Sequence, residues 1–284
     1  MSPNDGEVRR RFTAAAILIP LFLVAVVLGG AFFLAAILML TAAGAWELFG
    51  MTMTKPYRAR RLAGTGLALA FPSVLYLAPM EPLVVPALIA AGIVGIALAQ
   101  LLDPRGEEAL ASVAVTVTGA AYVGLLLGHQ ILIRELPRDV PGAPYWFGAL
   151  LLGVPIVLTW ANDTAAYFLG HRFGERKLLA RVSPGKSLEG AVGALAVTVL
   201  LALPTLWAVN LYTKLFGIGD AIAIGALVGL AAPCGDLVES SFKRDTGVKD
   251  SSRLIPGHGG VLDRFDAMLV TVPVYFYYVR GVVL

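Results

Sequence analysis

Long runs of apolar residues, broken by short polar segments, make up most of this chain. One run, "RFTAAAILIPLFLVAVVLGGAFFLAAILML", extends from Arg11 to Leu40 with a single charge. A helix needs about 20 mostly apolar residues to cross a bilayer, whereas a barrel strand alternates over about 10. Because these runs are long and do not alternate, they favour helices over a closed barrel. The pattern therefore predicts an all-α, polytopic integral membrane protein.

About nine transmembrane helices are predicted from the positions of these runs. The expected ranges are 12–29, 31–50, 62–79, 83–102, 110–133, 146–169, 188–209, 218–238 and 262–280. Only Gly29 and Gly30 separate the first two, which predicts a tight helical hairpin. An arginine-rich start before an apolar run also resembles a secretory signal. We interpret it as a retained first helix, because no clear cleavage site follows and apolar sequence resumes at once.

Composition and charge strengthen this interpretation. The chain is 58% hydrophobic and 14% charged, whereas soluble domains carry about 25% charged residues. If the N-terminus is cytoplasmic, the segments on that side hold 17 lysines and arginines and the opposite side holds four. That asymmetry follows the positive-inside rule and predicts a cytoplasmic N-terminus. The only cysteine, Cys234, excludes an intramolecular disulfide.

Ionisable residues within the predicted helices concentrate in the second half of the chain. In the first half, Glu47 is the clearest example. We therefore expect two regions: a transmembrane scaffold over 1–140, which could form a dimer interface, and a catalytic transmembrane domain over 141–284. In the predicted topology the polar residues of the second region lie at the cytoplasmic face.

Two pairs of acidic residues stand at the ends of the last two predicted helices. Asp236 and Glu239 lie at the end of one, and Asp263 and Asp266 begin the next. Acids at a helix C-terminus oppose the helix dipole, so helix capping does not explain Asp236 and Glu239. Capping at a helix N-terminus can explain one of Asp263 and Asp266 well, but it explains both poorly. Converging carboxylates suit Mg²⁺, which also binds substrate phosphates. We expect Asp236, Asp263 and Asp266 to bind metal, with a salt bridge as the alternative for Glu239.

Cations and glycines fill the segment between these acids. Glycines let backbone N–H groups approach an anion closely, as in the turn "PGHGG". The alternatives are positive-inside charge for the cations and a turn hydrogen bond for the histidine. The candidate phosphate contacts are Lys243, Arg244, Lys249, His258, Gly259 and Gly260.

A second polar set surrounds the loop after the sixth predicted helix. Asp163 lies about two turns from the end of that helix, so its carboxylate needs a partner. Lys186 and Ser187 directly precede the next helix. A lysine beside a helix N-terminus can hold a phosphate, and its alternative is a charge that sets topology. Together the two sets indicate phosphoryl or nucleotidyl transfer on a lipid at the cytoplasmic surface.

The stretch "SSFKRDTGVKDSSRLIPGHGGVLDRFD", from Ser240 to Asp266, resembles the signature of phosphatidate cytidylyltransferases (CDP-diacylglycerol synthases). That pattern is a serine, lysine-arginine, lysine-aspartate, histidine-glycine-glycine and aspartate-arginine-x-aspartate. The residues that match it are Ser240, Lys243, Arg244, Lys249, Asp250, Ser252, Pro256, His258, Gly259, Gly260, Asp263, Arg264 and Asp266.

Two upstream stretches also resemble this family. "NDTAAYFLGHRFG" is similar to its Asp-x-x-Ala-Tyr-x-x-Gly-x-x-x-Gly segment, and "SPGKSLEG" to its Ser-Pro-Lys-Lys-Thr-x-Glu-Gly loop. Gly185 stands where the family has a lysine, which removes one phosphate contact, and Ser187 stands where it has threonine. The pair Gly235-Asp236 also fits. The resemblance is specific over about 160–270 and extends to the first half only in hydropathy.

The resemblance implies the reaction of CTP with phosphatidic acid to give CDP-diacylglycerol and pyrophosphate, with Mg²⁺ and a monovalent cation such as K⁺. It also implies a homodimer among membrane lipids, and no nucleic-acid partner is expected. A chain this compact fits a bacterial inner membrane, with the site facing the cytoplasm. The implied catalytic residues are Asp236, Lys249, Asp263 and Asp266. The implied CTP and substrate contacts are Asp163, Lys186, Ser187, Lys243, Arg244, His258, Gly259, Gly260 and Arg264.

Other functions fit the sequence less well. A CTP-dependent polyprenol or dolichol kinase would transfer the γ-phosphoryl group and release CDP, but the long signature argues against it. CDP-alcohol phosphotransferases and prenyltransferases carry aspartate patterns that this chain lacks. A transporter would place its carboxylates near the bilayer midplane, often within repeats, whereas here they gather toward one face. The key acids are all present, which argues against an inactive scaffold protein.

Overall fold

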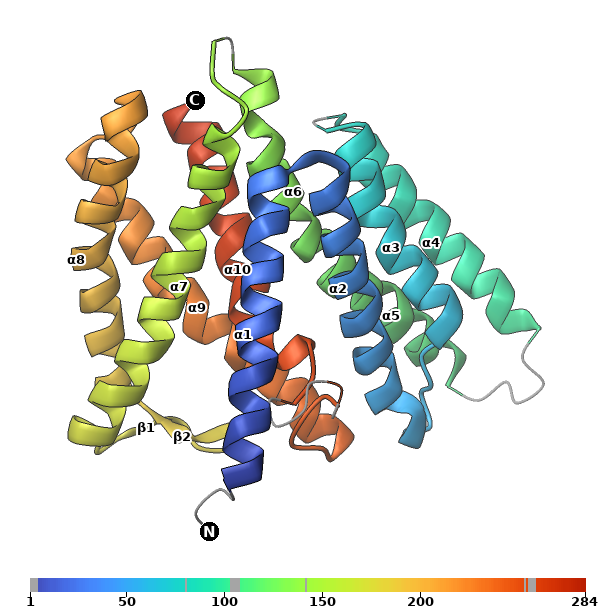
Figure 1. The fold of residues 1–284 in the computed structure, drawn as a ribbon. Helices are drawn as coiled ribbons and strands as arrows, with labels where there is room; N and C mark the ends of the chain where they lie inside the picture. The colour runs from blue at the N-terminus through green and yellow to red at the C-terminus, as the bar shows by residue number, and fades with distance from the viewer. Residues whose placement is uncertain (1–4, 80, 103–107, 141, 253, 255–258) are drawn as a thin grey trace. The chain divides into compact units, whose positions relative to one another are not determined.

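The computed structural model is helical apart from one short β-hairpin, and it describes residues 5–79, 81–102, 108–140, 142–252, 254 and 259–284 (Figure 1). Helix occupies each segment in which the apolar pattern predicts one. The α-helices are α1 (Asp5–Leu28), α2 (Gly30–Met51), α3 (Arg61–Leu77), α4 (Val84–Leu101), α5 (Ala109–Ala120), α6 (Leu126–Glu135), α7 (Phe147–Phe173), α8 (Leu188–Thr213), α9 (Ile218–Thr246) and α10 (Leu262–Tyr278).

Six helical stretches in the described residues are long and apolar enough to cross a membrane. They are Gly30–Thr54, Val84–Leu101, Ala109–Arg138, Phe147–Phe173, Leu188–Thr213 and Ile218–Thr246, with shorter apolar helices at Ala16–Leu28 and Arg61–Leu77. The third stretch joins α5 and α6 through a π-helical turn, Ala121–Leu125. This set of helices fits a membrane protein, while about nine spans and a cytoplasmic N-terminus stay predictions.

The chain divides into two compact units. Unit 1 comprises residues 1–135 and 245–264, and unit 2 comprises residues 136–244 and 265–284. The segment 245–264, which holds most of the family signature, thus packs with the first six helices. The expected division into a scaffold over 1–140 and a catalytic region over 141–284 concerns roles, and it stays a prediction.

In unit 1, α1 and α2 form the tight hairpin expected from their glycines. Gly29 and Gly30 have φ angles of 67° and 53°, which favour glycine. Arg134 is fully buried, and its guanidinium donates to the carbonyls of Val26 and Val27 at the end of α1. Glu135 accepts from the Gly30 amide at 3.0 Å. Arg134, which lies just beyond the predicted helix 110–133, therefore caps a helix end.

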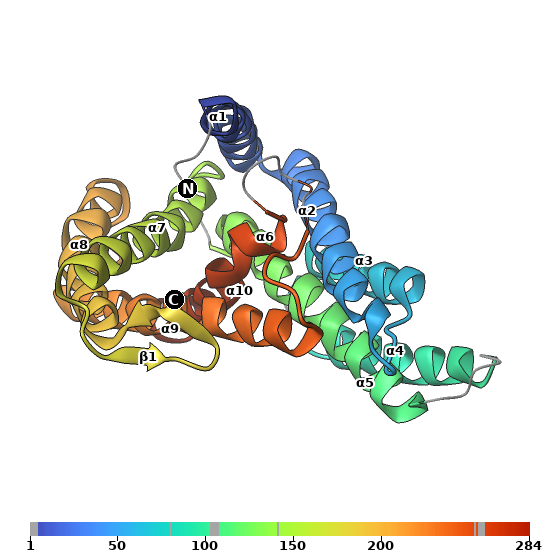
Figure 2. The same ribbon diagram turned by 90° about the horizontal axis from the view of Figure 1, so that it is seen from below.

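In unit 2, α7 and α8 lie side by side and are joined by an antiparallel hairpin of β1 (Lys177–Leu179) and β2 (Ser183–Ser187) (Figure 2). The sequence pattern did not predict these strands. Asn162 of α7 is buried and donates to the Thr198 hydroxyl of α8 and the Gly229 carbonyl of α9. This amide ties three helices together beside Asp163.

Candidate active site

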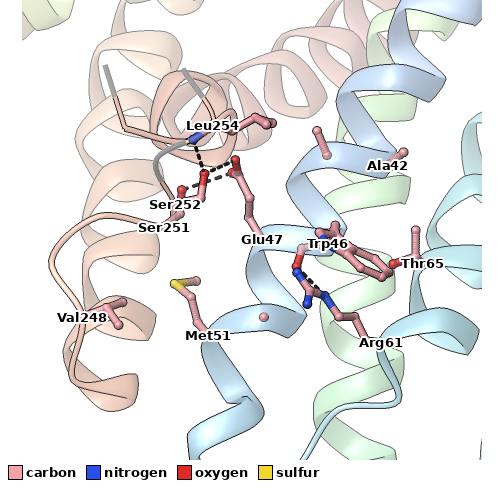
Figure 3. Close-up of a pocket in the computed structure, with 12 residues that line it drawn as sticks. Ala42, Trp46, Glu47, Met51, Arg61, Thr65, Val248, Ser251, Ser252 and Leu254 are labelled. Carbon is pink, nitrogen blue, oxygen red and sulfur yellow. Dashed lines mark hydrogen bonds between the residues drawn. The ribbon is translucent and has the colours of Figure 1, made fainter. Parts of the chain in front are cut away.

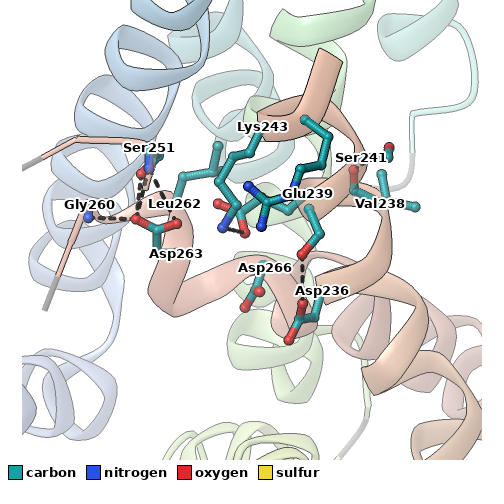
Figure 4. Close-up of polar contacts among 12 residues, drawn as sticks. Asp236, Val238, Glu239, Ser241, Lys243, Ser251, Gly260, Leu262, Asp263 and Asp266 are labelled. Carbon is teal, nitrogen blue, oxygen red and sulfur yellow. Dashed lines mark hydrogen bonds and ion pairs between the residues drawn. The ribbon is translucent and has the colours of Figure 1, made fainter. Parts of the chain in front are cut away.

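The helices α9 and α10 make backbone contact at Gly235. A Cβ atom on this residue would stand 2.3 Å from the Asp266 carbonyl oxygen and 2.8 Å from the Cα of Ala267. Only glycine permits so close an approach. Its next neighbour in sequence, Asp236, is thereby brought beside Asp266, and Figure 4 shows their carboxyl groups next to each other.

Asp236 lies at the centre of a carboxylate cluster in unit 2. Lys186 Nζ of β2 lies 2.7 Å from its Oδ2, and the Ser240 hydroxyl donates to its Oδ1 at 3.1 Å. The negative charges of Asp163, Asp236 and Asp266 act on one another, and Lys186 acts on Asp163. The structure thus brings together Asp163, Lys186, Asp236 and Asp266, which the sequence had assigned to one site.

Glu239 and Lys243 form a pair one turn further along α9. The Glu239 side chain is fully buried, and its Oε2 lies 2.6 Å from Lys243 Nζ. This is the salt bridge expected as the alternative to metal binding. Asp163, Asp236, Glu239 and Asp266 thus place four acidic side chains in this part of unit 2, with Lys186 and Lys243 among their partners, and such a gathering of carboxylates favours a cation. The described residues include no group of three or more acidic, histidine or cysteine side chains placed to hold a metal by themselves.

Ser187 positions the start of α8. Its hydroxyl accepts from the Gly190 amide at 3.2 Å as the N-cap of the helix. A Cβ atom on Gly174 would come within 2.5 Å of this hydroxyl, and one on Gly190 within 2.9 Å of the Gly170 Cα. The glycines of the two upstream stretches are therefore needed for the close packing of α7 on α8.

Glu189 holds the β-hairpin in place from the first turn of α8. Its carboxylate accepts from the Arg176 guanidinium at 2.8 Å and from the backbone amides of Glu175 and Arg176, each at 3.1 Å. Lys186 lies on β2, the second strand of this hairpin. The same short element therefore presents a lysine to Asp236 and is anchored to α8.

Unit 1 contains a second polar cluster, centred on Glu47 of α2. This side chain is 5% exposed. Its Oε1 accepts from the Ser252 hydroxyl at 2.6 Å and the Val261 amide at 3.0 Å, and its Oε2 accepts from the Ser251 hydroxyl at 3.1 Å and the Leu262 amide at 2.9 Å. Glu47 therefore connects α2 to both ends of the segment 247–261 between α9 and α10, called the signature loop below.

Asp263 is bound into the same loop. Its Oδ2 accepts from the Ser251 amide at 3.1 Å and the Gly260 amide at 2.8 Å, and it lies 2.8 Å from the Ser251 hydroxyl, whose single proton it shares with Glu47 (Figure 4). Gly259 has a φ angle of +79°, and a Cβ atom on it would come 2.6 Å from Asp263 Oδ2. These contacts match the capping alternative. Asp236 belongs to unit 2 and Asp263 to unit 1, so their convergence on one metal stays a prediction.

The remaining signature residues have varied surroundings. Lys249 and Arg264 are exposed, and Arg244 Nε of α9 lies 3.4 Å from the Val182 carbonyl. His258 lies outside the described residues. The contacts of these residues with a phosphate stay predictions.

The loop between α2 and α3 also holds the signature segment. The Tyr57 hydroxyl donates to Asp245, and Lys55 Nζ lies 3.9 Å from the same carboxylate. The hydrogen bond to Asp245 raises the pKa of Tyr57 to about 12.

Sequence reasoning did not assign Glu47 to the site. The signal was its charge within an apolar helix, which is costly unless the carboxylate is satisfied. Its partners lie more than 200 residues away along the chain: it is separated by 204 residues from Ser251 and by 215 from Leu262.

A family model described as the cytidylyltransferase family matches residues 9–282 of this chain. The chain belongs to the cytidylyltransferase family. The expectation drawn from the signature is therefore confirmed for the family, and the match extends well beyond the stretches that carried the resemblance.

Three relatives show how far the similarity extends. The uncharacterized protein YnbB of Escherichia coli is 40% identical over 67% of this chain and 61% of its own length. A phosphatidate cytidylyltransferase of Haemophilus influenzae is 46% identical over 48% of this chain and 47% of its own length. One from Pseudomonas aeruginosa is 35% identical over 94% of this chain and 95% of its own length. The chain thus spans under two thirds of the first two relatives and nearly all of the third.

Proposed function

We propose that this protein is a phosphatidate cytidylyltransferase, which converts CTP and phosphatidic acid to CDP-diacylglycerol and pyrophosphate. The observation that carries the proposal is the similarity to the Pseudomonas aeruginosa phosphatidate cytidylyltransferase, which continues over 94% of the chain at 35% identity. The cluster of Asp163, Lys186, Asp236 and Asp266 supports it, because it combines carboxylates with a phosphate-binding side chain.

The carboxylate cluster suits Mg²⁺. Asp236 and Asp266 supply hard oxygen atoms, and the gathering of acidic side chains around them favours a cation. Proteins commonly hold Mg²⁺ through one or two carboxylates, with waters and substrate phosphates completing the shell. When bound, Mg²⁺ would screen the charges of the two anionic reactants. We propose Asp236, Asp266 and Asp263 as its ligands, and a monovalent cation such as K⁺ as a second ion.

The reaction needs little proton transfer. An oxygen of the phosphatidate phosphate attacks the α-phosphorus of CTP and forms the new P–O bond, while the bond to the β-phosphate breaks and pyrophosphate leaves in line. The attacking oxygen is already anionic near neutral pH, so no general base is required. The protein's task is to hold two anions in contact.

Basic side chains are proposed to share that task. Lys186 exchanges its contact with Asp236 for a phosphate oxygen when CTP binds. The exposed positions of Lys249 and Arg264 suit contact with CTP or the lipid phosphate. Gly259 and Gly260 are proposed to let a phosphate approach the backbone closely, while the Gly260 amide itself donates to Asp263. The further proposed contacts are Asp163, Ser187, Lys243, Arg244 and His258.

We further propose about nine membrane spans in the bacterial inner membrane, with the N-terminus and the site facing the cytoplasm. The 17 to four distribution of lysine and arginine supports this orientation. Family analogy supports a homodimer, to which the apolar first half of the chain is suited.

The proposal is tested with the purified chain in detergent, supplied with CTP and phosphatidic acid. We expect CDP-diacylglycerol and pyrophosphate in equal amounts, no product after chelation of divalent ions, and recovery when Mg²⁺ is restored. Release of CDP with a phosphorylated lipid would instead identify a CTP-dependent kinase. Absence of both products in a folded preparation would reject the proposal.

A further inference from the structure

An apolar pocket of about 590 Å³ lies in unit 1, between α2, α3 and the start of the signature loop. Figure 3 shows its lining residues. Its walls are mainly apolar, from Ala42, Ala43 and Met51 of α2 and from Val248 and Leu254 of the loop segment. An apolar pocket of this size can hold part of an acyl chain.

The positively charged side chain of Arg61 lies at the edge of this pocket. The guanidinium of Arg61, the first residue of α3, stacks 3.7 Å from the Trp46 ring centroid, and its Nε donates to the Trp46 carbonyl at 3.1 Å. Its two terminal nitrogens have no acceptor in the part of the chain that the structure describes. Gly50 leaves room for the group, because a Cβ atom there would stand 3.0 Å from Arg61 Nη2.

A second donor lies one turn along α3. The Thr65 hydroxyl also lines the pocket, is buried, and has no hydrogen-bond partner among the described residues. Residues four apart share a helix face, so Thr65 and Arg61 serve the same side of the pocket. A buried hydroxyl without a partner costs free energy unless a ligand satisfies it.

The nearby carboxylate does not neutralise Arg61. Glu47 lines the pocket, yet both of its oxygens accept hydrogen bonds from the signature loop. The described residues contain no ion pair between Arg61 and an acid. A planar guanidinium with two free nitrogens matches the oxygens of a phosphate.

The position of Arg61 along the chain indicates whether the phosphate it would bind belongs to a lipid or is free in solution. Residues 51–61 form a segment that the charge distribution assigns to the cytoplasmic side, where anionic headgroups collect. Tryptophan and arginine side chains are typical of the membrane interface. A phosphate held by Arg61 beside an apolar pocket therefore fits the headgroup of a lipid better than a free anion.

We propose that this pocket binds an anionic glycerophospholipid, with its phosphate on Arg61 and Thr65 and part of an acyl chain between α2, α3 and the loop. The site goes beyond the proposed catalytic function, because all of its residues lie in unit 1 and its occupancy needs no CTP. Ser251 and Ser252 belong both to the pocket and to the hydrogen bonds around Glu47. A bound lipid thus packs directly against the loop that carries Asp263.

Binding is measured by quenching of Trp46 fluorescence with brominated phosphatidic acid. The protein is studied in detergent micelles, with phenylalanine replacing the other three tryptophans, Trp146, Trp160 and Trp207. We expect saturable quenching by phosphatidic acid and phosphatidylglycerol, and at least about tenfold weaker binding of phosphatidylcholine. Equal binding of the zwitterionic lipid would overturn the phosphate contact.

Matched arginine variants give the decisive result. Arg61→Gln should weaken phosphatidic acid binding about tenfold, as expected for a lost charge-assisted contact, and Arg61→Lys should weaken it less. Arg58→Gln removes an exposed charge from the loop just before α3 and should leave binding unchanged. Equal losses in the Arg58 and Arg61 variants would show unspecific attraction and refute the site.

Three further measurements test the hydroxyl contact, the apolar pocket and the lipid itself. Thr65→Val keeps the side-chain volume and should weaken binding about threefold at an unchanged unfolding midpoint. Ala43→Leu should reduce lipid binding by filling the pocket. Glycerol 3-phosphate, which has the headgroup without the chains, should compete poorly. Competition at the same concentration as the lipid would identify a free-phosphate site and overturn the proposal.

Discussion

The two polar clusters of this protein use carboxylates in opposite ways. In unit 1, Glu47 and Asp263 accept hydrogen bonds from hydroxyls and backbone amides of a single loop. In unit 2, Asp236 contacts Lys186 and the Ser240 hydroxyl, Asp266 accepts from the Ala267 amide, and the charges of Asp163, Asp236 and Asp266 act on one another. The carboxylates of the first cluster are each held by several donors, whereas those of the second accept fewer hydrogen bonds among the described residues and lie close to one another.

This difference separates carboxylates that hold structure from carboxylates that are free to bind. An acid whose oxygens are occupied by backbone amides stabilises a loop and has little capacity for another ligand. Carboxylates gathered against each other cost stability and are typical of functional sites. Asp236 and Asp266 are therefore better candidates for metal ligands than Asp263, although the sequence ranks Asp263 as highly as Asp236.

The largest expected effect is on turnover, from Asp236→Asn. Removing this carboxylate should lower CDP-diacylglycerol formation by about 10²–10³-fold or more, as for loss of a group that stabilises a transition state. The unfolding midpoint should hardly fall, since repulsion from Asp163 and Asp266 is relieved. Product formation and thermal unfolding are measured on the same preparation.

Asp220 provides the matched control on the same helix. Asp220 lies at the start of α9, and its carboxylate accepts hydrogen bonds from the Gly217 amide and from the Tyr278 hydroxyl of α10. Asp220→Asn should cost about 1 kcal/mol of stability, as for a weakened cap, and retain turnover. Near-normal turnover of the Asp236 variant would contradict the division between the clusters.

Glu47→Ala should show the reverse pattern and act first on stability. It leaves the Val261 and Leu262 amides without their acceptor, which should lower the free energy of unfolding by about 3 kcal/mol. Hydrogen exchange at these two amides should accelerate, and turnover should fall because the loop loosens. Glu81→Ala, at an exposed glutamate, should change stability by no more than about 0.5 kcal/mol. Equal stability of the two variants would show that the loop is held by other contacts.

Lys186→Met is expected to have an intermediate effect. Its Nζ contacts Asp236 in the free protein and is proposed to move to a phosphate of CTP. Losing one charge-assisted contact should raise the KM for CTP about tenfold. Lys177→Met, an exposed lysine on the other strand of the hairpin, serves as the control and should leave KM unchanged. Parallel changes in both variants would indicate a general effect of hairpin charge.

The smallest effect is expected from Gly185→Lys, which restores the lysine found in the family pattern. A Cβ atom at Gly185 meets nothing within 4 Å, so a side chain fits. The unfolding midpoint should not change, and the KM for CTP should fall about twofold to threefold, as for an exposed ion pair. Gly185→Ala should match the parent protein. A raised KM for the lysine variant would show that this turn does not face CTP.

Several features of the fold and site could be predicted because they depend on local sequence. The glycine hairpin between α1 and α2 required only the two residues that adopt positive φ. Asp163, Lys186, Asp236 and Asp266 were assigned to one site from residue type and signature, and the structure brings them together in unit 2. By contrast, Arg134 lies just beyond the predicted helix 110–133, and no local pattern shows that it is buried as a helix cap, because its acceptors lie over 100 residues earlier in the chain.

The sequence by itself determined where the helices lie, to which family the chain belongs and which residue types form its polar sites. Continuous apolar runs are sufficient for this, because a segment in lipid must satisfy its backbone internally as a helix. Only the tertiary structure decided which carboxylates are saturated and which are not. Glu47 meets Ser251 across 204 residues, and Gly235 allows α10 to approach Asp236, because hydrogen-bond partners depend on contacts between distant segments that no local pattern encodes.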